Sequence, residues 1–201
     1  MANGQERNEE YLAASIIKQH FPGLFSQNLR YDDMPDLQDE EKSIGVEVVR
    51  NLRDNQGKAH GFLDEFSNFR ENDIPKEKIA KLYKFGFEPF YSKGRLVGIR
   101  SGTYLINTNG VYSSIEKKLG KLQSGKYKIF KSNRLFVFVI KQVACFQRYQ
   151  IQELVDRICE LQEKKNIKFD VVYIYDEYNG EYDLWVCYLK TKLIRKYKPH
   201  N

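Results

Sequence analysis

Residues 35–50 read PDLQDEEKSIGVEVVR, and this stretch decides the fold that we expect. Its second half, residues 43–50, is a strongly apolar run that is typical of a β-strand. The preceding residues 28–38 look extended, and a polar turn separates the two segments. The stretch therefore predicts a β-hairpin with Asp36 and Glu47 on neighbouring strands.

Outward from this hairpin, apolar periodicity predicts further helices and strands. We expect helices at residues 9–20, 62–69, 75–85, 113–122 and 151–164, buried strands at 135–141, 169–175 and 182–189, short strands within 86–110, and a polar loop at 51–61. This order predicts an α/β fold with a mixed central β-sheet flanked by helices. We expect a single domain over residues 1–201, with an insertion around residues 51–110.

The composition indicates a globular protein with a polyanionic partner. Hydrophobic residues make up 41% of the chain, which suits a packed core and excludes a disordered protein. The net charge of +6 favours nucleic acid as the partner. The polar N-terminus and the lack of a long apolar run predict neither a signal peptide nor a membrane span.

The cysteines and the acidic residues near the C-terminus predict no chemistry of their own. Cys145, Cys159 and Cys187 are isolated in the sequence, so we expect reduced thiols in a cytoplasmic protein and neither a disulfide framework nor a zinc site. Asp176 and Asp183 flank an Asn-Gly turn, and we expect them to solvate that turn.

The two carboxylates of the first hairpin carry the strongest chemical signal. Side chains alternate along a strand, so Glu47 shares a face with Gly45 and Val49. A carboxylate within a β-branched run is costly to bury unless a partner compensates its charge. A divalent cation is one such partner, and Asp36 on the adjacent strand can share the ion.

A Pro-Asp pair ending at Asp36, ten further residues and then Glu47-Val48-Val49 resemble the motif of the PD-(D/E)xK nuclease superfamily. In that family a hairpin presents an Asp and a Glu to Mg²⁺, and the preceding helix often adds a further Glu. The resemblance implies a restriction-endonuclease-like core and a Mg²⁺ or Mn²⁺ ion held by Asp36 and Glu47.

The further glutamate is expected at the start of the first helix. Glu9 and Glu10 both occupy that place, and we favour Glu10 as the metal ligand, although helical phase leaves both near the edge of the apolar stripe. Either side chain could instead complement the positive end of the helix dipole.

The chain departs from the family motif at the position of the catalytic lysine, which is Val49 here. Nuclease subfamilies that lose this lysine usually supply one from elsewhere, and Lys118 is our candidate. On the expected helix 113–122, Lys118 falls within the apolar stripe, whereas Lys117 and Lys121 point further outward. A lysine on a buried face needs an anionic neighbour, which the metal-binding carboxylates or a phosphate would provide.

Structural roles compete with these assignments. Asp36 could start a turn after Pro35. Glu47 could pair with Arg50 or with a cross-strand lysine. The Lys118 ammonium could extend along its helix to water.

Together these features predict a metal-dependent nuclease that hydrolyses phosphodiester bonds, with DNA as the expected substrate. Asp36, Glu47, Lys118 and Glu10 are the expected catalytic residues. Such folds often act as homodimers, because the two strands of a duplex need two sites. Two alternatives stay open: a catalytically inactive nucleic-acid-binding module of the same fold, and a defence-associated or other protein-interaction domain with no nucleic-acid role.

Overall fold

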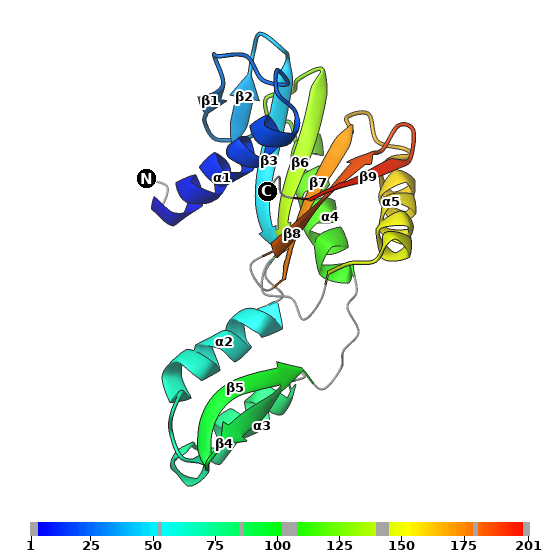
Figure 1. Ribbon diagram of the computed structural model, residues 1–201. Helices are drawn as coiled ribbons and strands as arrows, with labels where there is room; N and C mark the ends of the chain where they lie inside the picture. Colours follow the sequence, from blue (N-terminus) through cyan, green and yellow to red (C-terminus); the bar gives the residue numbers. More distant parts are fainter. Residues whose placement is uncertain are drawn as a thin grey trace. The chain divides into compact units, whose positions relative to one another are not determined.

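Two compact units make up the chain (Figure 1), and the computed structural model describes residues 4–51, 54–84, 87–101, 108–139, 145–178 and 181–198. Unit 1 comprises Met1–Asn51 and Ile106–Asn201, and unit 2 comprises Leu52–Leu105. Unit 2 therefore occupies nearly the segment in which the sequence predicted an insertion. No described helix is long and apolar enough to cross a membrane.

Unit 1 is built on a seven-stranded sheet of order β1-β2-β3-β6-β7-β8-β9. Its elements are α1 (Gly4–His20), β1 (Arg30–Tyr31), β2 (Leu37–Asp39), β3 (Ile44–Asn51), α4 (Asn109–Gln123), β6 (Ser132–Val139), α5 (Arg148–Gln162), β7 (Val171–Tyr178), β8 (Glu181–Tyr188) and β9 (Leu193–Tyr197). The neighbours β3, β6 and β7 run parallel, and the other neighbouring pairs are antiparallel. This confirms the predicted α/β class and the mixed central sheet.

Helices cover both faces of the sheet, which explains why its central strands are almost continuously apolar. Helix α1 packs on one face, in a core that includes Val46, Val48 and Phe136. Helices α4 and α5 pack on the other face, in a core that includes Leu135 and Val137 (Figure 1). Side chains alternate along β3, so its odd-numbered residues face α4 and α5.

The predicted hairpin is present as β2 and β3, with Leu37 opposite Val46. Gly45 makes its close packing possible. A Cβ atom at this position would lie 2.5 Å from the ring of Phe130 and 2.8 Å from the ring of Pro35. Any larger residue would therefore displace Pro35, which immediately precedes Asp36.

Unit 2 has its own small core. Its elements are α2 (Asp54–Phe66), the 3₁₀ helix η1 (Glu71–Asp73), α3 (Lys76–Lys84), β4 (Phe87–Ser92) and β5 (Arg95–Ser101). The two strands pair antiparallel, and Ala59, Phe62, Phe66, Ile74, Leu82 and Leu96 are buried against one another.

The loop predicted at residues 51–61 is wrong, because α2 begins at Asp54. Ala59, Phe62 and Phe66 lie on one face of this helix and are buried. Their packing outweighs the low helix propensity of the glycines in this segment. Of the segment 86–110 in which short strands were expected, residues 102–107 lie outside the described residues, and so does the Asn-Gly turn at 179–180.

Candidate functional site

Glu47, in the middle of β3, is the centre of the candidate site. Its side chain is only 4% exposed, although it carries a carboxylate. Both Lys118 and Tyr127 bond to the same oxygen, Oε1: the Lys118 ammonium forms an ion pair with it, and the Tyr127 hydroxyl donates to it at 2.7 Å. The second oxygen, Oε2, is buried and has no hydrogen-bond partner among the described residues.

Asp36 immediately precedes β2, the strand next to β3, and interacts with Glu47 electrostatically. Its carboxylate accepts a hydrogen bond of 2.6 Å from the backbone N–H of Val48. Burial is the main cause that raises the pKa of Asp36 to about 7, and the negative charge of Glu47 raises it further. The Val48 N–H and Lys118 act in the opposite direction, by favouring the ionised carboxylate.

Lys118 reaches Glu47 because α4 turns it toward the sheet. Ile115, Leu119 and Leu122 of this helix are buried, and the Lys118 side chain between them is 17% exposed. Lys117 and Lys121 are exposed, as helical phase predicted. The Lys118 ammonium therefore finds an anionic neighbour on the sheet instead of extending to bulk water.

Tyr127 is the member of this group that sequence analysis missed. It is buried, and burial followed by the hydrogen bond to Glu47 raises the pKa of its hydroxyl. It lies 80 residues from Glu47 in the sequence, so no local spacing links the two. The next residue helps to fix it: the Lys128 N–H donates to the Met34 carbonyl oxygen at 3.0 Å, and the Lys128 side chain pairs with Glu40.

The two glutamates at the start of α1 have different surroundings. Glu9 forms an ion pair of 3.1 Å with Arg50, at the end of β3. Glu10 is near enough to Asp36 for its negative charge to raise the pKa of that carboxyl. Because Arg50 pairs with Glu9 and Glu47 pairs with Lys118, the expected alternative of a Glu47–Arg50 pair is wrong.

The buried Glu47 carboxylate and the half-buried Asp36 carboxylate fit a divalent cation. Glu47 has one oxygen that accepts from two donors and a second that is buried without a partner among the described residues. Beside it, burial and the charge of Glu47 disfavour the ionised form of Asp36. A cation next to both carboxyl groups would satisfy the unpaired oxygen and favour ionised Asp36. Asp36 and Glu47 are the residues that could hold such an ion. We call the group of Asp36, Glu47, Lys118 and Tyr127 the Glu47 cluster.

Glu10 does not join these two carboxylates at direct ligand spacing. In the described part of the chain, only Cys145, Asp176 and Asp183 form a group of three potential metal ligands whose ligand atoms all lie within 4.8 Å of one another. Glu10 therefore acts on Asp36 at longer range, through its charge.

A surface pocket is lined by residues other than those of the Glu47 cluster. It has a volume of about 520 Å³ and is lined by the end of α5, by residues 168–170 and by Leu189, Lys190 and Lys192. None of the predicted site residues lines it. The Glu47 cluster is thus a set of side chains between a sheet and a helix, and not part of that pocket.

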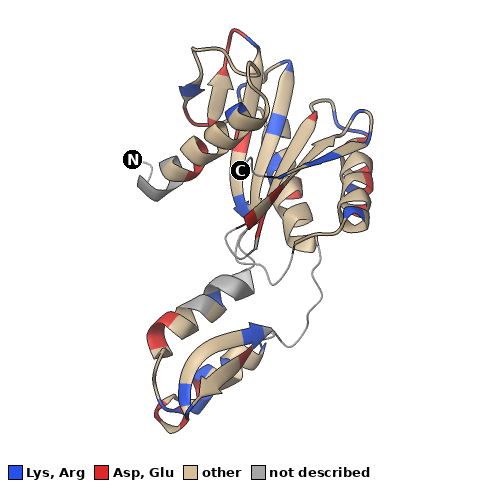
Figure 2. Cartoon of the chain, in the orientation of Figure 1, with Lys and Arg blue, Asp and Glu red and all other residues tan. Residues whose placement is uncertain are grey.

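Basic and acidic residues are interspersed on both units (Figure 2). Unit 1 has 23 Lys and Arg against 20 Asp and Glu, and unit 2 has 10 against 7, so the basic excess is shared between them.

No protein-family model, curated protein sequence or solved structure matches this chain.

Proposed function

We propose that the chain is a metal-dependent nuclease with a restriction-endonuclease-like core, and that DNA is its substrate. The observation that carries this proposal is the buried Glu47 carboxylate, which has an unpartnered oxygen and lies close enough to Asp36 to raise its pKa. The buried Glu47 carboxyl and the half-buried Asp36 carboxyl beside it are favoured to be ionised together when a cation lies next to both. The order of the surrounding strands and helices is compatible with the core that the sequence motif implies.

Asp36 and Glu47 would hold Mg²⁺ or Mn²⁺, whose oxygen preference matches two carboxylates. Such an ion lowers the pKa of a bound water and offsets negative charge on a scissile phosphate. Glu10 would act through a water molecule, since it is not at direct ligand spacing from the other two.

The protein's own side chains would have distinct tasks. The Lys118 ammonium would stabilise the negative charge that develops on the phosphate, replacing the motif lysine that is absent at Val49. The Tyr127 hydroxyl would fix the orientation of the Glu47 carboxylate by holding its Oε1 atom. The net charge of +6 favours a polyanionic substrate, whose binding would weaken as salt concentration rises. A homodimer would supply one site for each strand of a duplex.

The second candidate is a nucleic-acid-binding module that has lost catalysis. Its support is that Lys118 already neutralises Glu47 and that the Val48 N–H already satisfies one oxygen of Asp36. In that case the group would be a buried structural network. It also accounts for Val49, which packs in the apolar core under α4 and α5.

A cleavage assay on plasmid and single-stranded DNA separates the two candidates. It is run with Mg²⁺ or Mn²⁺, with and without a chelator, on the wild type and on Asp36→Asn. The nuclease proposal predicts metal-dependent cleavage that Asp36→Asn abolishes while DNA binding is retained. DNA binding without cleavage in any metal would support the binding module, and the absence of both would contradict both candidates.

A further inference from the structure

Two aspartates and a cysteine form a second group on the α4–α5 face of the sheet. None of the three belongs to the Glu47 cluster. Asp176 on β7 lies opposite Asp183 on β8, and Cys145 lies shortly before α5. One ligand atom from each of the three lies within 4.8 Å of the other two. We call Cys145, Asp176 and Asp183 the Asp176 cluster.

This group is buried, contrary to the expectation that Asp176 and Asp183 solvate a turn. Asp176 is 0% exposed and Asp183 is 8% exposed. The Oδ2 atom of Asp176 accepts a hydrogen bond of 2.6 Å from the Phe146 N–H. Its Oδ1 atom is buried and has no hydrogen-bond partner among the described residues.

The neighbours of Asp176 satisfy its charge only in part. The Trp185 indole is close enough to lower the pKa of Asp176, but its Nε1 atom is buried and has no hydrogen-bond partner among the described residues. Lys196 pairs with Asp183 at 2.7 Å, and Asp176 has no ion pair in the described part of the chain. Burial therefore prevails and raises the pKa of Asp176 to about 6.

The thiol of Cys145 completes the group. Its Sγ atom lies 3.9 Å from the Asp176 carbonyl oxygen. Burial and the charges of Asp176 and Asp183 raise the pKa of this thiol to about 11, so without a cation it stays protonated. A metal ion next to the sulfur would reverse this effect, because a coordinating thiol is deprotonated.

We propose that Cys145, Asp176 and Asp183 bind a divalent transition-metal ion, and that zinc is the best match. A thiolate together with carboxylates suits a borderline-soft ion, whereas Mg²⁺ prefers oxygen ligands alone. Ligand atoms of a tetrahedral zinc ion, at about 2.0–2.3 Å from the metal, lie roughly 3.3–3.8 Å apart. A closure of about 1 Å would bring the three side chains to this spacing, and the displaced thiol proton would pass to solvent.

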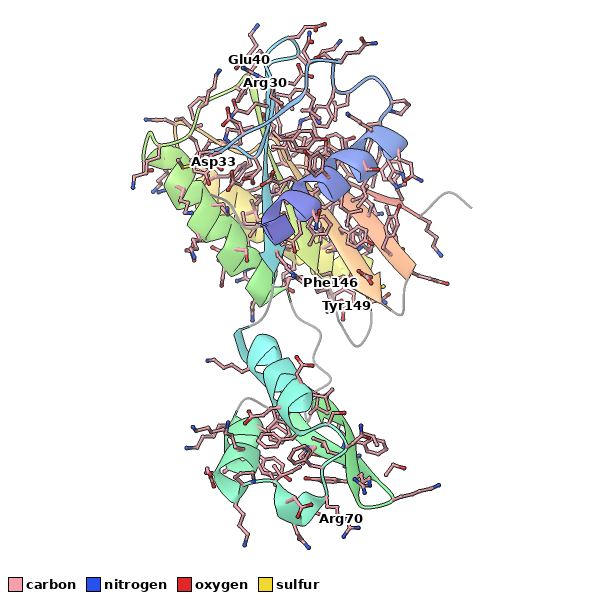
Figure 3. All side chains as sticks on the ribbon, turned by 90° about the vertical axis from the view of Figure 1, so that its left-hand side faces the viewer. Arg30, Asp33, Glu40, Arg70, Phe146 and Tyr149 are labelled. Carbon is pink, nitrogen blue, oxygen red and sulfur yellow. The ribbon has the colours of Figure 1, made fainter. Side chains whose placement is uncertain are left out.

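The position of the site is different from that of the nuclease site. Phe146 and Tyr149 mark the start of α5 in Figure 3, at the opposite end of the sheet from Arg30 and Glu40. In the sheet register, Asp176 is aligned with Val139, whereas Glu47 is aligned with Leu135. The ion would join the segment that enters α5 to the β7–β8 hairpin, and three protein ligands would leave a fourth position for water.

A titration with Co²⁺ tests this site in the full chain. Cobalt substitutes for zinc, and a cobalt–thiolate bond gives a charge-transfer absorption band that an all-oxygen site at Asp36 and Glu47 cannot give. The wild type is expected to show this band at one Co²⁺ per chain, and Zn²⁺ is expected to abolish it by competition. Cys145→Ser should lose the band, whereas the matched control Cys159→Ser should retain it.

A second measurement does not depend on the folding of a variant. X-ray absorption of the zinc-loaded wild type should show one sulfur ligand at about 2.3 Å together with oxygen ligands. A spectrum with oxygen and nitrogen ligands only, or a cobalt band that survives in Cys145→Ser, would overturn the proposal. Neither outcome bears on the nuclease proposal, which is read out by cleavage with Mg²⁺ or Mn²⁺.

Discussion

Two buried acidic groups lie on the same face of one sheet, and they differ in how their charge is balanced. In the Glu47 cluster, a lysine from α4 reaches the central carboxylate and a tyrosine hydroxyl supports it. In the Asp176 cluster, Lys196 forms its ion pair with Asp183, and the fully buried Asp176 has no ion pair of its own among the described residues. The comparison indicates that the Glu47 cluster can fold without metal, whereas the Asp176 cluster depends more on a bound ion.

Among substitutions that leave both metal-binding carboxylates in place, removal of the Lys118 ammonium should have the largest effect on activity. We expect Lys118→Ala to lower kcat by about 100–1,000-fold, because the ammonium stabilises developing charge on the phosphate. Lys117→Ala, a change of an exposed lysine on the same helix, is the matched control and should leave kcat nearly unchanged. Lys196→Ala removes the corresponding cation beside the Asp176 cluster and should also leave cleavage intact. Single-turnover cleavage measures all three, and near wild-type kcat for Lys118→Ala would contradict the assigned role.

The close packing beneath Asp36 is particular to the Glu47 cluster. We expect Gly45→Ala to lower the free energy of unfolding by about 2 kcal/mol, because the added methyl group overlaps Phe130 and Pro35. Gly120→Ala in α4, where a Cβ meets nothing within 4 Å, should instead stabilise the protein by about 0.5–1 kcal/mol. Urea denaturation compares the two, and equal stability changes would show that the packing at Gly45 is not limiting.

The hydroxyl of Tyr127 should contribute less than the cation. Tyr127→Phe removes the hydrogen bond to the Glu47 carboxylate, and we expect a loss of about 1.5 kcal/mol in unfolding free energy. Cleavage should fall with it, because Glu47 is then held by Lys118 alone. Tyr149→Phe, at an exposed position of α5, is the control that should change neither quantity. If the Tyr127→Phe protein is as stable as the wild type, the hydrogen bond from Tyr127 to Glu47 does not stabilise the fold.

The pH dependence of the unfolding free energy also distinguishes the two clusters, and the expected change is smaller than those above. The pKa of Asp36 is raised from 3.8 to about 7, so the folded state holds this proton more tightly than the unfolded state. The protonated Asp36 carboxyl therefore contributes fully to the stability of the folded state below about pH 3.8, and this contribution is lost as the pH rises through 7. The corresponding window of Asp176 closes near pH 6.

Between pH 6 and 7.5 the change therefore reports mainly on Asp36. We expect metal-free protein to lose on the order of 1 kcal/mol over this interval, and Asp36→Asn to abolish that loss. Saturating Mg²⁺ should reduce the loss in the wild type, because the ion favours the ionised carboxylate. Thermal unfolding at each pH measures the change. If the stability of Asp36→Asn falls with pH as steeply as that of the wild type, a group other than Asp36 titrates in this interval.

The sequence predicted those parts of the Glu47 cluster that follow from local periodicity. Strand alternation put Glu47 on one face of β3, the hairpin put Asp36 beside it, and helical phase turned Lys118 inward. Tyr127 was missed because its partner lies 80 residues away, and only the folded sheet brings the two together. Within α1, Ala13, Ala14, Ile16 and Ile17 are buried, whereas the apolar Leu12 is 47% exposed.

The Asp176 cluster was missed although its sequence contains a usable signal. Asp176 lies opposite Asp183 in the β7–β8 pair, and an Asn-Gly dipeptide between two apolar runs is a sequence signal for a hairpin that pairs its flanking residues. The burial of Asp176 and Asp183 could not be predicted, since acidic residues beside a turn are usually solvated. Cys145 could not be linked to them, because it lies 31 residues before Asp176 and no local spacing connects the two.

The most direct test of the central claim is plasmid cleavage by the wild type and by Asp36→Asn, with Mg²⁺ or Mn²⁺ and with chelator. We predict cleavage by the wild type that the chelator stops, and no cleavage by Asp36→Asn at DNA concentrations where it still binds. Equal cleavage by both proteins, or none by the wild type with either ion, would contradict the claim that Asp36 and Glu47 hold a catalytic metal.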